Sequence, residues 1–403
     1  MYDLVIIGAG VSGLAAAISA KWENPQLNIL ILEKQSKCGR KLSASGNGKC
    51  NVTNEVFDED CYHSSAKGFI ADFVKEHSNS EVIDFFNKCG IPLYDDKGYY
   101  YPISNQAKQV TYKLLDLCSR LGVEIITDNE VTGIKDKTVV TKDREYMSRN
   151  VIIACGSNAW DKLGGSSSGY DLINKLGISM TNIAPGLTPI YVTDDKLKHA
   201  KGVRINGTAT LHINDSVIRE SGQIQINEDN LSGIAMINLS CYIAGYDKES
   251  LESSLWLDVM PAFTWDELKE YITKEITNNN NEKVRTMLEG FLPSAFVDYL
   301  LSRISINGDI LLEKLSEKQL NKITSNIKKL TFTPVLQSDY SRAQVSLGGV
   351  AVSEINTKTF ECIKHPGLYV VGELLDMTGK CGGYNISFAV LSGMAAAKDI
   401  AFK

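Results

Sequence analysis

A glycine-rich turn between a short apolar strand and a helix constrains the fold of this chain more than any other feature. Residues 3–7, DLVII, have the uninterrupted β-branched pattern of a buried parallel strand. The motif GAGVSG follows and leads into LAAAISAKW, which is typical of a helix, and the next apolar run ends at Glu33. This is the order of a βαβ unit with G-x-G-x-x-G in its turn. The sequence therefore predicts an α/β, Rossmann-like dinucleotide-binding fold.

Each residue of this motif has its own expected task. Gly8 makes the tight turn, Gly10 lets the backbone approach a pyrophosphate, and Gly13 lets the helix pack close to the strand. The helix N-terminus offers free N–H groups and a partial positive charge to the phosphates. Glu33 follows Gly13 at the distance at which an acidic residue accepts hydrogen bonds from a ribose.

A second glycine-rich helix entrance occurs near the other end of the chain, in GKCGGYNISFAVLSG, residues 379–393. An apolar strand, GLYVVG, and the acids Glu373 and Asp376 precede it. We expect this last helix to point its positive N-terminal end at a flavin ring, where it would stabilise reduced flavin. Gly382 and Gly383 would let the backbone lie against the flat ring, and Asp376 would bind the ribityl chain or a nearby hydroxyl.

A polar loop, KCGRKLSASGNGKCNVTN at residues 37–54, lies between the two glycine-rich motifs in the sequence. Its glycines, serines and three cations, Arg40, Lys41 and Lys49, suit a loop that wraps a pyrophosphate and reaches a flavin. The chain has no second G-x-G-x-x-G after a strand, since GGSSSG at 164–169 has no strand directly before it. FAD is therefore the predicted cofactor, and NADH or NADPH either meets it transiently as an electron donor or is not used.

Composition excludes several function classes. A chain of 403 residues with 43% apolar content is expected to form two or three domains with real cores. A net charge of −6 speaks against nucleic acid and membrane surfaces as partners, and no apolar run reaches the ~18 residues of a membrane span. MYDLVIIGAG has no basic leader, so a cytoplasmic location is expected. The oligomeric state is not predicted.

The nine cysteines and five histidines do not indicate a disulfide framework or a metal site. The cysteine count is odd and no pair has C-x-x-C spacing, which is typical of reduced cysteines. The histidines, His63 among them, show no ligand spacing, and we expect surface or structural roles for them. No metal is predicted.

The middle of the chain differs from its ends. VIIACG, residues 151–156, is another buried strand that ends in glycine, and VEIITDNEVTGIKDKTVVT alternates as hairpin strands do. Short alternating runs between 186 and 260 predict a β-rich region. Residues 265–329 have helical periodicity, interrupted by NNNNE at 278–282, which favours a turn or link.

At this point the chain resembles a known family, the BaiN/RdsA-type NAD(P)/FAD-dependent oxidoreductases, also described as aminoacetone-oxidase-type FAD-binding flavoproteins. The resemblance is carried by GAGVSG (8–13), GRKLSASGNGKCNVTN (39–54), YYYPISNQA (99–107), VIIACGSNAW (151–160), LGGVAVSEINTKTFE (347–361) and GELLDMTGKCGGYNISFAVLSG (372–393). It covers both ends of the chain, while the middle resembles the family only loosely.

The resemblance implies an FAD-binding domain from residues 1–185 and 335–403. It also implies a β-rich domain from 186–262 with 330–350, and a helical insert from 263–329. Carried over position by position, the implied FAD contacts are Gly8, Gly10, Gly13, Glu33, Arg40, Lys41, Ser45, Gly46, Asn47, Asn51, Gly156, Gly372, Glu373, Asp376, Gly382, Gly383, Tyr384 and Asn385.

The chain departs from the family where a substrate would be met. Relatives often have an arginine in the segment aligned with KGYYYP, where this chain has Tyr99. Relatives also often have a Thr–His-type segment where this chain has INEDNLSG, residues 226–233. The resemblance therefore carries no substrate to this chain. The candidate catalytic residues are Tyr99, Tyr101, Lys380 and Cys381, none with an assigned role.

Three functions stay open on the sequence. The first is a reductase that takes hydride from NAD(P)H and, through flavin N5, reduces an unsaturated or carbonyl small molecule. The second is an oxidase of a small, aminoacetone-like amine that produces H₂O₂. The third is a non-catalytic flavin-binding or RNA-associated protein, against which the acidic charge speaks.

Overall fold

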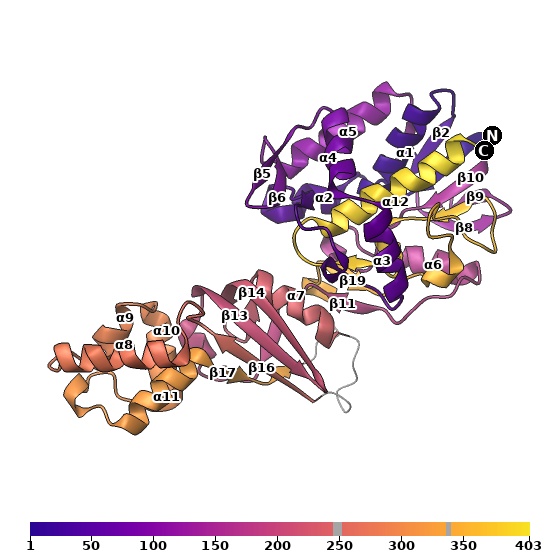
Figure 1. Ribbon diagram of the computed structural model, residues 1–403. Coiled ribbons are helices and arrows are strands. Elements are labelled where there is room, and N and C mark those ends of the chain that lie inside the picture. The colour runs from indigo at the N-terminus through magenta and orange to yellow at the C-terminus, as the bar shows by residue number, and fades with distance from the viewer. Residues whose placement is uncertain (245–251, 336–339) are drawn as a thin grey trace. The chain divides into compact units, whose positions relative to one another are not determined.

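The computed structural model describes residues 1–244, 252–335 and 340–403, and these form two compact units (Figure 1). The first unit holds residues 1–186 and 340–403, and the second holds 187–244 and 252–335. Each unit has a hydrophobic core of its own. The β-rich and helical parts of the middle region share one core, and the three-way domain division stays a prediction.

The first unit is built on a seven-stranded sheet. Its strands lie in the order β7 (Glu124–Ile126), β2 (Ile29–Leu32), β1 (Tyr2–Ile7), β10 (Glu145–Ile153), β9 (Thr138–Thr141) and β8 (Val131–Lys135). A further strand, β20 (Leu368–Val370), pairs with β10. The pairs β7–β2, β2–β1, β1–β10 and β10–β20 are parallel. The prediction of a Rossmann-like fold assembled from both chain ends is confirmed.

The registers show why these segments are strands. Ile7 of β1 lies opposite Leu32 of β2 and Ile153 of β10, and Val370 of β20 also lies opposite Ile153. The apolar residues of β1 and β2 are buried, as expected for parallel strands covered on both faces. The hairpin prediction is correct for β8 and β9 but wrong for the segment before them, because β7 pairs parallel with β2 instead.

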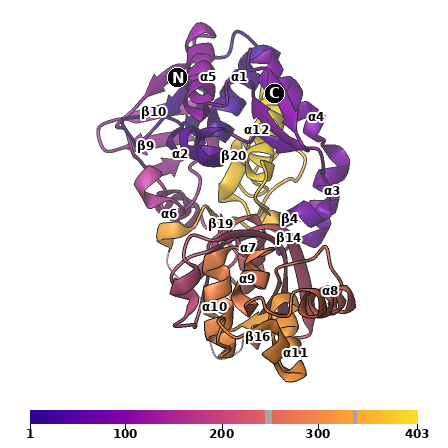
Figure 2. The ribbon, with the colours of Figure 1, turned by 90° about the vertical axis from the view of Figure 1, so that its left-hand side faces the viewer.

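Two helices from opposite ends of the chain lie side by side against this sheet (Figures 1 and 2). They are α1 (Val11–Glu23) and α12 (Tyr384–Ala401). A Cβ at Gly393 of α12 would lie 2.5 Å from the carbonyl oxygen of Ser12 in α1, so only glycine allows this close approach. The N-termini of both helices lie in the first unit, which also contains the predicted cofactor contacts.

The remaining elements of the first unit surround this core. They are α2 (Arg40–Ala44), β3 (Thr53–Asn54), β4 (Tyr62–His63), α3 (Lys67–Glu76), α4 (Asn79–Lys88), β5 (Leu93–Asp96), β6 (Tyr99–Pro102), α5 (Ala107–Arg120), α6 (Ser168–Lys175), β11 (Ala184–Gly186), β19 (Val345–Leu347) and β21 (Thr378–Gly379). Three small sheets join segments that are distant in sequence: β3–β6–β5, β21–β4 and β11–β19.

The second unit combines a sheet with helices. Its strands lie in the order β17 (Leu330–Phe332), β16 (Ser253–Asp258), β13 (Arg204–Ile213), β14 (Ser216–Ile226), β15 (Asn230–Ser232), β12 (Ile190–Val192) and β18 (Pro334–Val335). Side chains of β13 alternate between buried and exposed, as in a half-solvated antiparallel sheet. The helices are α7 (Ile234–Ile243), α8 (Trp265–Asn278), α9 (Val284–Glu289), α10 (Ser294–Ile304) and α11 (Glu317–Lys328).

No helix in the part of the chain that the structure describes is long and apolar enough to cross a membrane.

Candidate cofactor and active site

The turn between β1 and α1 contains three glycines, and only Gly10 has open space where a side chain would lie. A Cβ at Gly8 would lie 2.4 Å from the carbonyl oxygen of Ala154, and one at Gly13 would lie 2.1 Å from that of Gly8. A Cβ at Gly10 would meet no atom within 4 Å. Gly10 precedes the first residue of α1, and no side chain caps the helix there. The turn thus presents uncapped backbone N–H groups to open space, which is what a pyrophosphate site requires.

Glu33 is fixed beside this turn at the end of β2. Its Oε2 accepts a hydrogen bond from the backbone N–H of Ala9 at 2.8 Å, and its Oε1 accepts one from Gln35 at 2.9 Å. Each carboxylate oxygen can accept a second bond, so capacity for a ribose hydroxyl remains. Asn129 donates its backbone N–H to the Glu33 carbonyl at 2.9 Å, and its own buried side-chain oxygen has no partner among the described residues.

The loop after α2 has a backbone that favours glycine and asparagine. Gly46, Asn47, Gly48 and Cys50 have φ values of 55°, 53°, 86° and 65°. Residues 46–49 are exposed, in keeping with a segment whose polar groups would face a ligand. Ser45, a further predicted contact, donates its hydroxyl to the carbonyl of Leu42 at 2.7 Å.

Arg40 already has protein partners. Its guanidinium donates to the side chain of Gln35 at 2.9 Å and to the carbonyl of Lys162 at 2.6 Å. Both acceptors lie in the loops that follow β2 and β10, so Arg40 joins these loops. A guanidinium has five N–H donors, and the remaining ones would be available to a phosphate.

The structure gives a different reason for the glycines at the start of α12 from the one predicted from the sequence. Gly383 has a φ of +96°, and a Cβ there would lie 2.5 Å from the backbone nitrogen of Thr53 in β3. Gly382 has a φ of +141°, and its Cβ would lie 3.0 Å from the Tyr384 ring. Protein neighbours and backbone conformation therefore require glycine here, whether or not a flavin ring lies nearby. No side chain caps the first turn of α12, so its N–H groups are left for another acceptor.

Glu373 lies at the centre of contacts between distant segments. Its carboxylate forms an ion pair with Lys41 of α2, and its Oε1 accepts from the Ser157 hydroxyl at 2.6 Å and the Ser346 N–H at 3.2 Å. Lys41 and Glu373 were both predicted to contact FAD, and the structure pairs them with each other. Gly372, the preceding residue, has a φ of +69° and donates its N–H to Ser392.

Two further predicted contacts also have protein partners. Asp376 is buried and accepts hydrogen bonds from the backbone N–H of Ser65, at 3.0 Å, and from its hydroxyl. The amide of Asn385 both accepts from and donates to the backbone of Gly379, at 2.8 and 2.7 Å. These side chains fix the segment before α12 in place, and their contact with FAD stays a prediction.

The candidate catalytic tyrosines come from β6, next to the same turn. A Cβ at Gly382 would lie 3.4 Å from Cε1 of Tyr99. Burial and then the negative charge of Asp96 raise the pKa of Tyr101, with Cys381 among the smaller influences. The structure thus brings Tyr99, Tyr101 and the turn at Cys381 together, although they lie about 280 residues apart in sequence.

Cys381 does not have the character of a reactive thiolate. Burial raises its pKa to about 11, so the group is a neutral thiol near pH 7. The tyrosine that follows the turn, Tyr384, also has a raised pKa, mainly through burial and a hydrogen bond with Cys61. All nine cysteines lie in the described part of the chain, and none of them forms a disulfide there.

His63 was assigned a structural role from the sequence, yet it lies beside this turn. Its strand, β4, pairs with β21, with His63 opposite Thr378. Burial, followed by the positive charges of Lys67 and Lys380, lowers its pKa to about 4. No local motif marks His63, because its position depends on pairing with a strand more than 300 residues away.

The residues present fit FAD, as two kinds of observation indicate. Open space lies over Gly10 and over Gly156, where a Cβ would meet no atom within 4 Å. Buried polar atoms without a partner among the described residues lie beside predicted contacts at both ends of the site. One is the side-chain oxygen of Asn129 near Glu33, and the other is that of Asn51, which would lie 2.9 Å from a Cβ at Gly383. An extended ligand with phosphates and hydroxyls would satisfy such groups.

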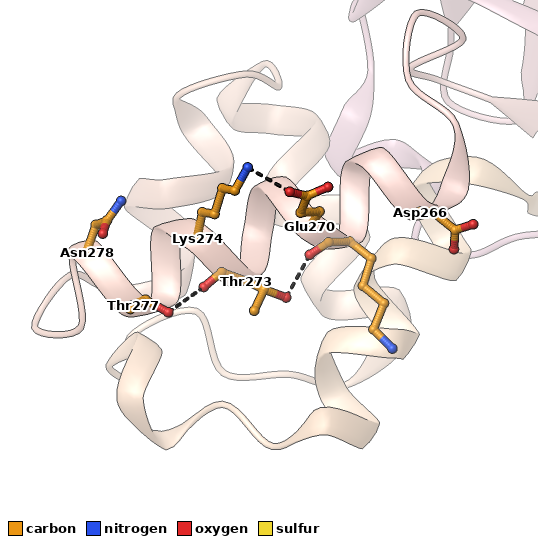
Figure 3. Close-up of a pocket in the computed structure, with 7 residues that line it drawn as sticks. Asp266, Glu270, Thr273, Lys274, Thr277 and Asn278 are labelled. Atoms are coloured by element: carbon orange, nitrogen blue, oxygen red, sulfur yellow. Dashed lines mark hydrogen bonds and ion pairs between the residues drawn. The ribbon is translucent and has the colours of Figure 1, made fainter.

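Two surface pockets of the second unit contain none of the predicted site residues. One of about 430 Å³ lies along α8, where Lys274 pairs with Glu270 at 2.7 Å and the threonines bond backbone carbonyls of the preceding turn (Figure 3). Another of about 400 Å³ is lined by residues such as His199, Arg285 and Asp309. Among the residues described, no group of three or more His, Cys, Asp or Glu is arranged to hold a metal ion.

Comparison with known proteins gives the family. The model of the HI0933-like protein Rossmann domain matches residues 2–399. The chain is 31% identical to the 3-dehydro-bile acid delta(4,6)-reductase of Clostridium scindens over 406 aligned positions, covering 100% of this chain and 99% of the relative. It is 28% identical to the ribosomal RNA dihydrouridine synthase of Escherichia coli, covering 99% and 98%.

A solved structure shares the fold. It is the 3-ketosteroid delta1-dehydrogenase of Sterolibacterium denitrificans, with a TM-score of 0.52 and 12% identity, covering 100% of this chain and 99% of the other. The chain therefore belongs to the HI0933-like Rossmann family and is an FAD-dependent oxidoreductase.

Proposed function

We propose that this protein is a reductase that adds hydrogen across an unsaturated bond conjugated to a carbonyl group in a small molecule, with NADH or NADPH as electron donor. FAD, when bound, supplies hydride transfer at its N5 atom. Its pyrophosphate would be held by the β1–α1 turn at Gly10, its adenosine ribose by Glu33, and its flavin end by the N-terminus of α12. The chain's own groups would bind the substrate and supply a proton.

The position of the β6 tyrosines beside the α12 turn carries this proposal, because it puts phenols next to the predicted flavin end of the site. Phenols and thiols are ordinarily protonated near pH 7, and burial raises the pKa of Tyr101, of Tyr384 and, to about 11, of Cys381 further. Reduction of a conjugated double bond needs a hydride on one carbon and a proton on the other, and a protonated phenol can donate that proton. We assign this role to Tyr101, which is only partly buried.

The names of relatives support addition of hydrogen to an unsaturated substrate. One is called a delta(4,6)-reductase, and others are called dihydrouridine synthases. Because the latter act on ribosomal RNA by name, our expectation that nucleic acid is not a partner stays a prediction. The amine-oxidase alternative requires a group that accepts a proton from an ammonium substrate. The protonated phenols and thiol at this turn do not suit that role, and His63, whose pKa burial lowers to about 4, is a weak base.

The test is turnover with a panel of candidate substrates. Purified FAD-loaded protein would be incubated without oxygen with NADH or NADPH and conjugated enones, and gain of two hydrogen atoms would be measured by mass spectrometry. We expect Tyr101→Phe to slow turnover by roughly a hundredfold, the usual contribution of a general acid. Tyr112→Phe removes an exposed phenol from α5 and is the matched control.

Three outcomes would overturn the proposal. The first is consumption of a small amine in air with formation of peroxide and no reduction of any enone. The second is conversion of uridine in ribosomal RNA fragments while every small enone is left unchanged. The third is equal turnover by Tyr101→Phe and wild type, which would remove the proton donor from the mechanism.

A further inference from the structure

A lysine and two serines meet at one edge of the sheet in the first unit. Lys34 follows Glu33 just after β2, and its ammonium group donates to the hydroxyl of Ser166 and, at 3.4 Å, to that of Ser168. The two hydroxyl oxygens are 2.9 Å apart. Both serines belong to GGSSSG, residues 164–169, a glycine-rich segment to which the sequence assigns no role. We call Lys34, Ser166 and Ser168 the Lys34 cluster.

The Lys34 cluster lies at the same edge of the sheet as the predicted cofactor site. β2 and β10 are the two neighbours of β1, and both run parallel to it, so the loops after all three strands lie at one edge. Ligands of open α/β sheets bind at this carboxyl edge. The carboxylate of Glu33 accepts the N–H of Ala9 in the β1–α1 turn at 2.8 Å. Lys34 is therefore one residue away from the group expected to hold the adenosine ribose.

The Lys34 cluster is open to a ligand. All three of its residues are partly exposed. A Cβ at Gly156, shortly after β10, would meet no atom within 4 Å. A Cβ at Gly169, in the first turn of α6, would lie 3.6 Å from the carbonyl oxygen of that glycine. The unfilled space at Gly156 therefore lies close to the segment that carries the two serines.

The ammonium group of Lys34 has unused hydrogen-bonding capacity. It has three N–H donors, and within the described part of the chain its bonded partners are the two serine hydroxyls. Each hydroxyl can also accept a further hydrogen bond. A partly buried charge is usually paired or fully hydrogen-bonded, because removing it from water is costly. A ligand that offers an acceptor to Lys34 would satisfy this group.

The charges around Lys34 favour a neutral ligand group over a phosphate. The thiol of Cys155 reports them: burial raises its pKa, the charge of Glu33 raises it further, that of Lys34 lowers it, and that of Glu130 raises it. Two carboxylates thus act on the same group as the single ammonium, and a phosphate would face like charges here.

A purine base matches the donors and acceptors of the Lys34 cluster. Adenine is neutral, its ring nitrogens such as N7 accept hydrogen bonds, and its N6 amino group donates them. An ammonium group can donate to a ring nitrogen while a serine hydroxyl accepts from the amino group. Adenine is also bonded directly to the ribose that Glu33 is expected to hold.

We propose that Lys34, with Ser166 and Ser168, binds the adenine ring of FAD and gives the site its preference for this base. This inference rests on FAD being the cofactor, and it assigns a task to the GGSSSG segment. It requires that the Lys34 cluster contact the base and neither the phosphates nor the flavin. Ligands with adenine should therefore depend on Lys34, and ligands without adenine should not.

The experiment compares apoproteins of wild type, Lys34→Met and Ser166→Ala, with Ser167→Ala as the matched control. Ser167 lies in the same segment, but it is exposed and its hydroxyl donates to Asp171 at 3.2 Å. Affinities for FAD, ADP, UDP and FMN would be measured by calorimetric titration, and apoprotein melting by circular dichroism. ADP and UDP share ribose and diphosphate but differ in the base, and FMN carries the flavin without adenosine.

We expect Lys34→Met to weaken FAD and ADP roughly ten- to a hundredfold, the equivalent of one hydrogen bond to a charged group. Ser166→Ala should weaken both by up to roughly tenfold, as for a neutral hydrogen bond. UDP and FMN should bind each variant as they bind wild type, so the preference for ADP over UDP should fall. Ser167→Ala should change no affinity, and no variant should lower the melting temperature.

Three results would overturn the assignment. Unchanged ADP affinity in Lys34→Met would show that adenine is bound elsewhere. Equal weakening of ADP and UDP would place the contact on the ribose or the phosphates. Loss of FMN affinity together with a lower melting temperature would show that the Lys34 cluster supports the fold. Wild-type protein that binds FAD and prefers ADP to UDP but reduces no enone would refute the proposed function and leave this assignment standing.

Discussion

Replacing Gly10 and Gly13 separately by alanine should have opposite consequences, although the two residues are three positions apart in one motif. The added methyl group at Gly10 would meet no protein atom within 4 Å, and the backbone there, at φ −77° and ψ −179°, suits alanine. The methyl group at Gly13 would lie 2.1 Å from the carbonyl oxygen of Gly8. The first change fills space intended for a ligand, and the second fills space occupied by the protein.

The magnitudes follow from these contacts. Gly13→Ala overpacks a fixed turn and should cost about 1–3 kcal/mol of the free energy of unfolding. For a domain of this size that corresponds to a melting temperature lower by roughly 2–4 °C per kcal/mol. Gly10→Ala should change the stability of the apoprotein by at most about 1 kcal/mol, the scale of an N-cap replacement. It should, however, remove at least one charge-assisted hydrogen bond to the pyrophosphate, weakening FAD roughly ten- to a hundredfold.

Thermal unfolding of the apoproteins by circular dichroism and titration with FAD by flavin fluorescence check both expectations. The informative comparison is between the two variants, because each controls for the other. The reasoning would be refuted if Gly10→Ala bound FAD like wild type, or if Gly13→Ala melted at the wild-type temperature.

Three further changes test single groups at the site. Cys381→Ser should keep most of the turnover, because a buried thiol with a pKa near 11 does not act as a thiolate; loss of flavin reduction in rapid-mixing experiments would contradict this. The contribution of His63 to the free energy of unfolding should fall by about 3 kcal/mol between pH 6.5 and 4, since unfolded His63 binds a proton there and folded His63, with its pKa near 4, does not. His63→Gln should flatten that pH dependence in chemical denaturation, and an unchanged curve would speak against a lowered pKa. Lys41→Met leaves the Glu373 carboxylate without its cation and should lower the free energy of unfolding, measured by chemical denaturation, by about 1–2 kcal/mol. Adding Glu373→Gln should recover part of this loss, and simple additivity of the two changes would show that the residues are not energetically coupled.

Local sequence patterns predicted the parallel strands and the two glycine-entered helices of the first unit. A buried parallel strand, the glycine turn and the following helix are encoded within about thirty residues, so local patterns reveal them. The last helix and its strand carry equally strong local signals, and β20 indeed pairs with β10 in the sheet that contains β1. We also predicted from the sequence that glycine is required at positions 382 and 383. The structure gives contact with protein neighbours as the reason, where the prediction gave contact with a flavin ring.

The contacts between the ends of the chain were beyond sequence reasoning. Lys41 and Glu373 were each predicted to contact the cofactor. In the structure they form an ion pair with each other, although more than 300 residues separate them in sequence. His63 reaches its position through strand pairing, which no short motif records. Periodicity reports which face of an element is buried, but it does not report which distant segment covers that face.

The most direct test of the central claim is anaerobic mixing of the FAD-loaded protein with NADH and, separately, with NADPH, while the flavin absorbance is followed. The account predicts rapid bleaching by at least one nucleotide, and return of the colour on addition of a conjugated enone without oxygen. If neither nucleotide bleached a firmly bound flavin, while a small amine did and air restored the colour with formation of peroxide, the protein would be an oxidase and the central claim would be wrong.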